Sequence, residues 1–389
     1  MAKLTEKIKS IDEEIEKKSS IDKILLIAIL TLNVLGLIFV LSSSLPHAQS
    51  LVEQGVINSV YFFFTKQLKS TFFAWFALFA GFLIPIKFYK KFSLPAFFGI
   101  LFALFLVVFP LSPFRTNLNT TAFRWLNLGF ITFQPSEIGK FIVIIYLATW
   151  FDSKGKDIKS FSFGFIPFLI LAGILSGLII LQPDLGTLIV IFAISVIIFF
   201  VAGANISHLI FMASLASLAF YYAVLNSADN YRLARFRVWT NPEEDPTGAG
   251  HQIYQSLLAI GSGGSNGVGL GRSKQAFFIP EAFSDGIFTI IGEELGFVKI
   301  LAFVFLAYGV FIWRGFEISK NIKNKFAMLV AIGITSWIAV QMFINIASFT
   351  SLIPMTGVPL PFISFGGSSL LVLMFASGVL LNLSQYREK

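Results

Sequence analysis

The sequence contains no cysteine, three histidines and few charged residues. Without cysteine, a disulfide framework, thiolate catalysis and a cysteine-based metal site are excluded. The histidines stand far apart at His47, His208 and His251, which argues against a histidine metal cluster. Charged residues make up 13% of the 389 positions, whereas 56% are hydrophobic and 47 are phenylalanine. A soluble protein of this size could not bury so much apolar surface, so the composition predicts an integral membrane protein.

Long apolar runs dominate the chain, and a helix needs roughly 20 such residues to cross a bilayer. They predict an all-α polytopic membrane protein with about ten transmembrane helices, at residues 24–43, 71–87, 95–111, 136–151, 162–181, 186–202, 207–225, 287–313, 327–350 and 368–383. The predicted organisation is an N-terminal tail at 1–23, a membrane domain at 24–383 and a C-terminal tail at 384–389. A large loop at 226–286 separates spans seven and eight.

Basic residues set the predicted orientation, because Lys and Arg concentrate in short cytoplasmic loops. With the N-terminus inside, the short outer loops receive Lys66, Lys69, Arg115 and Arg124, whereas most other basic residues fall in the tails and inner loops. Both termini are therefore predicted to be cytoplasmic and loop 226–286 to lie outside. The net charge of +8 then reflects membrane topology rather than nucleic-acid binding.

Two short outer segments combine charged and amide side chains. TAFRWLNLGFITFQPSEIGK (121–140) holds Arg124 and Lys140, two cations that suit a lipid-linked phosphate, with Gln134 and Glu137 at a helix start. Glu137 and Lys140 are three residues apart and could equally form a local ion pair. LQPDLGT (181–187) supplies Asp184, which could instead be a plain turn or cap residue.

Glycine and proline mark two further outer segments. Loop 226–286 contains RLARFRVWTNP (232–242), spaced like an interfacial helix, and then YQSLLAIGSGGSNGVGLG. The glycine-rich part could cradle a phosphate, but it lacks a P-loop ending, so a flexible re-entrant loop lining a cavity is the favoured interpretation. IPMTGVPLPFISFGGSS (353–369), which includes Ser364, is predicted to be a wall of the same cavity.

Four carboxylates stand beside an apolar helix in IPEAFSDGIFTIIGEELGF (279–297), where charge is costly. Asp285 is at the mouth of span eight, with Glu281 just before it. Glu293 and Glu294 fall two turns into the span and are expected to pair with polar groups inside the bundle.

These motifs together resemble the SEDS family of shape, elongation, division and sporulation proteins, which includes FtsW, RodA and SpoVE. The resemblance runs in the family's order from residue 124 to 369, through FRWLNLG, QPSEIGK, QPDLGT, YQSLLAIGSGGSNGVGLG, IPEAFSDGIFTIIGEELGF and TGVPLPFISFGGSS. GVGLGRSKQAFFIPEA is more similar to the FtsW and SpoVE branch. The chain departs from the family pattern at Phe283-Ser284 and Gly286, which flank the key aspartate and put its local hydrogen bonding in question.

The resemblance implies a peptidoglycan glycosyltransferase of the bacterial cytoplasmic membrane that polymerises lipid II during septal cell-wall synthesis and cell division. Asp285 matches the family's key aspartate and is the expected catalytic base of an inverting transfer. Substrate binding is expected at Arg124 and Lys140, which would hold the diphosphate, and at Glu281, Gln134, Glu137, Asp184 and Ser364.

The same resemblance suggests the partners and cofactors. The expected partners are lipid II, a class B penicillin-binding protein that acts as transpeptidase, and other divisome or elongasome membrane proteins, with no nucleic acid. No cofactor is certain, although Mg²⁺ or Mn²⁺ could bridge carboxylates and diphosphate.

Three other functions stay open: a RodA-type elongation polymerase, a lipid II flippase and a non-catalytic scaffold for a transpeptidase. The charged residues cluster on the predicted outer side, and apart from Lys299 no charged track crosses the bundle, which favours the enzyme over the flippase.

Overall fold

The computed structural model describes residues 19–109, 124–127, 129, 132–182, 184–225, 238–245, 247–248 and 250–388. Most of the predicted interfacial helix at 232–242 lies outside these residues, as does most of the predicted N-terminal tail.

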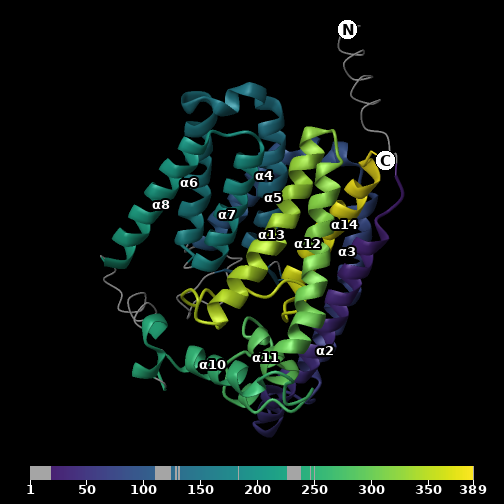
Figure 1. Ribbon diagram of the computed structural model, residues 1–389, viewed down its shortest axis with the longest axis vertical. Coiled ribbons are helices and arrows are strands. Elements are labelled where there is room, and N and C mark those ends of the chain that lie inside the picture. Colours follow the sequence, from purple (N-terminus) through teal and green to yellow (C-terminus); the bar gives the residue numbers. More distant parts are fainter. Residues whose placement is uncertain are drawn as a thin grey trace.

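The described chain is a helical bundle with one small hairpin (Figure 1). The helices are α2 (Lys23–Glu53), α3 (Phe62–Leu83), α4 (Ile86–Val108), α5 (Pro135–Lys154), α6 (Ile166–Ile180), α7 (Leu185–Val201), α8 (Ile206–Leu225), α10 (His251–Gly263), α11 (Ile287–Lys299), α12 (Leu306–Lys320), α13 (Lys325–Phe349) and α14 (Gly367–Leu383). Strands β1 (Leu126–Asn127) and β2 (Thr132–Phe133) pair antiparallel, with Leu126 opposite Phe133. The prediction of a helical membrane fold is confirmed, with this hairpin as an addition.

Short 3₁₀ and π segments adjoin the helices, at Gly155–Lys159, Phe161–Phe165, Pro242–Glu244, Gln275–Phe277, Ile300–Phe305 and Ser384–Tyr386. The π segment Ile300–Phe305 joins α11 to α12, and the combined stretch Ile287–Lys320 is kinked at Gly296, which has φ +71°.

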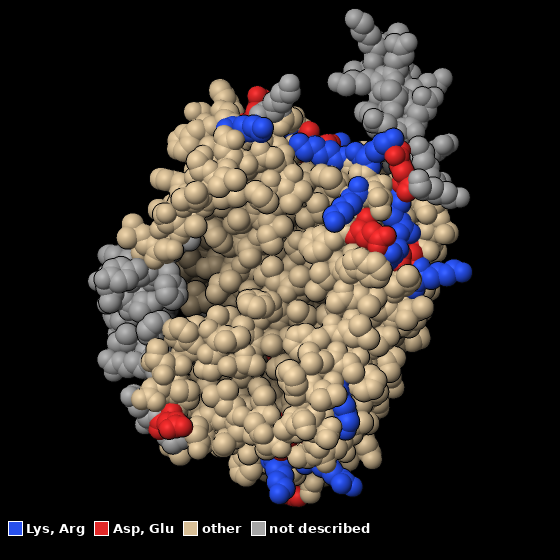
Figure 2. All heavy atoms as spheres, viewed as in Figure 1, with Lys and Arg blue, Asp and Glu red and all other residues tan. Residues whose placement is uncertain are grey.

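Within the described residues, six helical stretches are long and apolar enough to cross a membrane: Lys23–Glu53, Ile86–Val108, Phe161–Ile180, Ile287–Lys320, Lys325–Phe349 and Gly367–Tyr386. Figure 2 shows charged side chains gathered toward two ends of the molecule, with a broad uncharged band between them. A bilayer-facing surface has this appearance, so the chain is a multi-pass membrane protein. All ten predicted runs fall on helices, but the number of about ten spans stays a prediction.

The structure corrects three predicted boundaries. Helix α2 continues to Glu53 rather than ending near residue 43, and it contains Pro46. The second predicted span, 71–87, corresponds to α3. This helix ends at Leu83 because Pro85 fixes the extended turn that starts α4. Helix α4 therefore begins at Ile86 instead of residue 95.

Helix α13 is the most buried of the six candidate membrane spans among the described residues. It packs against α5, α7 and α12, and most of its residues are buried. Elsewhere in the bundle, α3 packs closely on α14. A β-carbon added at Gly81 of α3 or at Gly378 of α14 would lie closer than 3.0 Å to the backbone of the facing helix. Small residues allow this close approach, which is how helices associate in a membrane.

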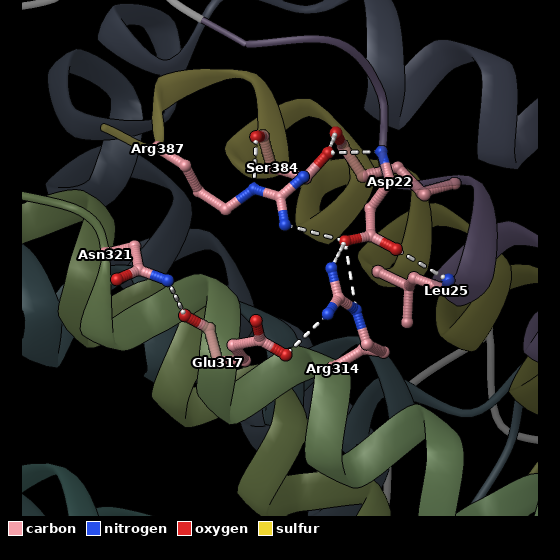
Figure 3. Close-up of polar contacts among 8 residues, drawn as sticks. Asp22, Leu25, Arg314, Glu317, Asn321, Ser384 and Arg387 are labelled. Atoms are coloured by element: carbon pink, nitrogen blue, oxygen red, sulfur yellow. Dashed lines mark hydrogen bonds and ion pairs between the residues drawn. The ribbon is translucent and has the colours of Figure 1, made fainter. Parts of the chain in front are cut away.

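The two described ends of the chain meet at the end of the bundle opposite α10 and α11 (Figure 1). Asp22 accepts hydrogen bonds from Leu25 N (2.9 Å), Arg387 Nη1 (2.8 Å) and the Arg314 guanidinium, while its own N–H donates to Ser384 Oγ (Figure 3). We call Asp22, Arg314, Ser384 and Arg387 the terminal cluster. The described ends of the chain thus lie together at one end of the bundle, and the assignment of both termini to the cytoplasm stays a prediction.

Charge dominates the terminal cluster. Burial by itself would raise the pKa of Asp22, but the hydrogen bonds from Arg314 and Leu25 N and the charges of Arg314 and Arg387 outweigh it and lower that pKa.

Candidate active site

Five parts of the chain meet near the C-terminal end of α13. They are the first turns of α5, α7 and α11, the second half of α13, and the connecting segment 350–366 that leads to α14. Figure 2 shows the surface hollowed beside this region, between the group of α6 to α8 and α10. A separate cavity of about 610 Å³ between α3, α4 and α5 has mostly apolar walls and contains none of the predicted site residues.

Asp285 lies directly before Gly286, the N-cap residue of α11, and is partly buried. Its carboxylate faces the backbone of the connecting segment: a β-carbon added at Gly357 would lie 3.6 Å from Asp285 Oδ2. Gly357 has φ +69°, in the left-handed region that glycine adopts without strain. The glycine therefore lets the segment turn beside the carboxylate without placing a side chain against it.

Asn345 of α13 holds the backbone on both sides of this contact. Its Nδ2 donates to the carbonyl oxygens of Asp285 (2.8 Å) and Val358 (2.7 Å), and the side chain is completely buried. Asn345 was not among the site residues predicted from the sequence. Its signal was present, since Gln341 and Asn345 are two amides one helical turn apart in an apolar span, where polar side chains are costly.

Lys140 lies deep in the bundle with a full set of partners. Its Nζ is 2.7 Å from Glu137 Oε1 and 2.9 Å from Gln341 Oε1, and it lies over the Trp337 ring at 5.2 Å from the centroid. Gln341 Nε2 in turn donates to Pro359 O at 2.9 Å. The local ion pair that the sequence allowed is confirmed, and Gln341 ties Lys140 of α5 to α13 and to the connecting segment.

Lys140 is 1% exposed, so in this conformation the ammonium supports the site from inside the bundle. The expected direct contact of this group with a diphosphate stays a prediction.

The starts of α5 and α7 are joined through Gln134 and Asp184. Gln134 Nε2 donates to Ser136 Oγ (3.0 Å) and to Asp184 Oδ2 (3.2 Å), while Asp184 Oδ1 caps α7 by accepting from Thr187 N (3.3 Å). Asp184 is therefore the cap residue that the sequence allowed, and it also bridges two helices.

Helix α7 also approaches the connecting segment. A β-carbon at Gly186 would lie closer than 3.0 Å to Thr356 O, so the start of α7 packs directly on the segment that faces Asp285.

The family of the chain follows from comparison with known proteins. The family model named for FtsW, RodA and SpoVE, and described as a cell cycle protein, matches residues 23–389. The chain belongs to the FtsW/RodA/SpoVE family. The predicted family is thereby confirmed.

Two relatives match along nearly their whole length. Stage V sporulation protein E of Bacillus subtilis is 39% identical over 95% of this chain and 98% of the relative. A probable peptidoglycan glycosyltransferase FtsW of Geobacter sulfurreducens is 35% identical over 93% of this chain and 95% of the relative.

Solved structures share the fold. A chain from "Structural coordination of polymerization and crosslinking by a peptidoglycan synthase complex" superposes with a TM-score of 0.76 at 23% identity, covering 94% of this chain and 98% of that one. The rod shape-determining protein RodA of Thermus thermophilus gives a TM-score of 0.65 at 22% identity, covering 95% of this chain and 98% of RodA.

The remaining predicted site residues of this FtsW/RodA/SpoVE protein take three kinds of position. Arg124 is partly buried two residues before β1, whose partner strand β2 leads into α5. Glu281 is exposed with φ +47°, an unusual value for a residue with a side chain, in the turn that leads to Asp285. Ser364 is buried, and its Oγ accepts from Leu360 N (2.7 Å), so the hydroxyl closes a turn in the connecting segment.

Glu293 and Glu294 hold the glycine-rich loop, as expected of structural carboxylates. Glu293 accepts from Ser273 Oγ and from Lys274 N (3.0 Å) and Gln275 N (3.2 Å). Glu294 accepts from Ser42 Oγ of α2 and from Gly271 N (3.0 Å).

Residues 264–275, predicted to be a flexible loop lining a cavity, pack against α11 in the structure. The backbone of the loop also bonds α11 directly, for example from Val268 N to Glu293 O (2.9 Å) and from Phe297 N to Gly264 O (2.9 Å). Such pairing needs close backbone approach, which the glycines permit.

Across the described residues, no group of three or more His, Cys, Asp or Glu side chains is arranged to hold a metal ion. Binding of Mg²⁺ or Mn²⁺ through the substrate stays a prediction.

Proposed function

We propose that this protein is a peptidoglycan glycosyltransferase that polymerises lipid II, with Asp285 as the catalytic base. One observation carries the proposal: the Asp285 carboxylate faces Gly357 where the starts of α5, α7 and α11 converge with the connecting segment. The relative named a probable peptidoglycan glycosyltransferase FtsW supports the activity, since it matches over nearly the whole chain.

The chemistry requires one base and a stabilised leaving group. The hydroxyl oxygen of the acceptor sugar attacks the anomeric carbon of the donor, and its proton passes to the Asp285 carboxylate. The bond from the anomeric carbon to the lipid diphosphate breaks in the same displacement, so negative charge develops on the diphosphate. Arg124, two residues before the β1–β2 hairpin that leads into α5, is the proposed cation for that charge.

The other predicted residues act on the shape of the site in this proposal. The Glu137–Lys140 pair orients Lys140, which bonds Gln341 and so fixes α5 relative to α13, while the Gln134–Asp184 bond joins the starts of α5 and α7. Ser364 fixes the connecting segment, and the turn at Glu281 sets the approach to Asp285. Remote groups of this kind contribute to catalysis by holding the reacting groups in place.

A class B penicillin-binding protein is the proposed partner, and the bacterial cytoplasmic membrane is the proposed location. The structural relative from a peptidoglycan synthase complex supports an assembly that couples polymerisation to crosslinking. The relatives named SpoVE and FtsW favour a role in septal synthesis over one in elongation.

The test is reconstitution of the purified protein in proteoliposomes with fluorescent lipid II, alone and with a class B transpeptidase. The proposal predicts glycan strands that grow with time. These strands should be made by this protein and not by a contaminating, moenomycin-sensitive polymerase. Protein-dependent transfer of lipid II across the bilayer without polymer would instead support the flippase. Absence of both products under all conditions would reject the proposal.

A further inference from the structure

Asn345 makes two hydrogen bonds that converge on the Asp285–Gly357 contact. Its Nδ2 reaches Asp285 O at 2.8 Å and Val358 O at 2.7 Å, so one amide grips the residue that bears the carboxylate and the residue next to Gly357. Both accepting groups are backbone carbonyls. The contacts therefore fix main chain rather than side chains, on two segments that are distant in the sequence.

The first bond orients the backbone at the start of α11. Thr289 N donates to Gly286 O (3.1 Å), whereas the Asp285 carbonyl points toward α13 and accepts a hydrogen bond from Asn345 Nδ2. The direction of this carbonyl fixes the peptide plane after Asp285, and with the preceding turn also held it limits the direction in which the side chain leaves the backbone. A second link, from Phe365 N to Phe283 O (2.9 Å), holds the preceding turn to the same connecting segment.

The amide orientation is determined by its surroundings. With Nδ2 facing two carbonyl oxygens, both contacts are attractive, whereas the flipped amide would place Oδ1 against them. In this orientation Oδ1 is buried without a hydrogen-bond partner among the described residues. An unsatisfied buried oxygen costs stability, so an apolar side chain would suit a purely packing role better.

We infer that Asn345 is a positioning residue that sets the orientation of the Asp285 carboxylate against Gly357. Its catalytic consequence rests on the proposed function. Asn345 touches no reacting atom in this account and acts through the backbone of Asp285. Replacing it should slow the chemical step and leave binding of lipid II unchanged, because the groups proposed to hold substrate are elsewhere.

The first test is kinetic. Asn345→Leu keeps the branching at Cγ but has no donor, and Asn345→Asp keeps the shape while its ionised form cannot donate. Both should lower kcat by roughly tenfold or more, as expected for loss of two hydrogen bonds that orient the base, with KM for lipid II unchanged. Thr335→Val is the control, because Thr335 is buried on the same helix and its hydroxyl bonds only Ala331 O within it (2.8 Å).

Acidification separates orientation from packing. A protonated carboxyl at position 345 regains one donor, so activity of Asn345→Asp relative to Asn345→Leu should rise as the pH falls. A pH-independent ratio between these two variants, or a kcat within twofold of wild type for both, overturns the inference.

A second test does not depend on activity. Since the chain has no cysteine, Asp285→Cys introduces a single thiol whose labelling rate reports its position. Adding Asn345→Leu should change that rate several-fold, but not the rate of a thiol introduced by Asn58→Cys in an exposed loop. Equal rates at position 285 with and without Asn345→Leu overturn the inference. Failure of the wild type to polymerise lipid II would reject the proposed function and leave this comparison valid.

Discussion

At the scale of single residues, the site is built from contacts to the backbone. The Asp285 carboxylate faces Gly357, and Asn345 donates to two backbone carbonyls. Gln341 joins Lys140 to the backbone carbonyl of Pro359. The sequence predicted Asp285 through its resemblance and the Glu137–Lys140 pair through its spacing. It could not predict that Lys140 also meets Gln341, 201 positions away, because that contact exists only once α5 packs on α13.

Gly357→Ala tests the space beside the carboxylate. An alanine at φ +69° costs about 1–2 kcal/mol, and its methyl group would lie 3.6 Å from Asp285 Oδ2. Polymerisation should fall about tenfold, which corresponds to roughly 1.4 kcal/mol in the barrier.

The matched control is Gly55→Ala, since Gly55 has φ +72° and nothing within 4 Å of an added β-carbon. Both variants should lose similar stability, measured as melting temperature in detergent, and only Gly357→Ala should lose activity. Equal activity losses would show that backbone strain, not the contact with Asp285, is responsible.

At the scale of elements, apolar runs predicted helices well and their ends poorly. Pro85 starts α4, whereas Pro46 lies inside α2 and Pro95 inside α4, so proline by itself did not mark the boundaries. The packing of loop 264–275 could not be predicted from the sequence either. Its partners Glu293 and Glu294 belong to α11, and Ser42 belongs to α2. A glycine-rich sequence indicates either a conformationally free backbone or close approach of two backbone segments. In this loop the glycines permit close approach to α11.

Gly263→Ala and Gly261→Ala test that close approach, since both glycines lie in α10. A β-carbon at position 263 would lie closer than 3.0 Å to the backbone at Gly292 and Glu293, whereas one at position 261 would meet nothing within 4 Å. Gly263→Ala should destabilise the protein by roughly 1–3 kcal/mol through overpacking. Gly261→Ala should be neutral or stabilise α10 by up to about 1 kcal/mol.

Thermal unfolding and limited proteolysis within 264–275 measure both effects. If the two variants behave alike, α10 and the loop do not pack on α11 as described.

At the scale of the whole molecule, the terminal cluster closes the bundle at the end remote from the site. Asp22 connects the start of α2 with α12 through Arg314 and with the C-terminal segment through Arg387 (Figure 3). The two arginine partners of Asp22 are more than 290 positions away along the chain. From the sequence they were therefore interpreted only as basic residues of a loop and a tail.

Asp22→Asn should lower stability by about 1.5–3 kcal/mol at neutral pH, since it removes hydrogen bonds between charged groups. The folded-state pKa of Asp22 is lowered, so its contribution is complete above the unfolded value of about 3.9 and is lost as the pH falls through the lower folded value. Melting temperatures should therefore differ between wild type and variant at pH 5 to 7 and converge in stronger acid.

Lys323→Gln is the control, because its pair with Glu388 is largely exposed and should contribute no more than about 1 kcal/mol. A difference between wild type and Asp22→Asn that persists unchanged below the folded pKa would show that the carboxylate charge is not its source.

The central claim is that Asp285 accepts the proton in polymerisation of lipid II. The most direct measurement compares initial rates of glycan-strand formation by wild type and Asp285→Asn, reconstituted at equal amounts with lipid II and the same transpeptidase partner. Asparagine is nearly isosteric with aspartate and cannot accept the proton, so the account predicts loss of polymerisation with lipid II binding and melting temperature retained. A folded Asp285→Asn protein that forms strands near the wild-type rate would contradict it.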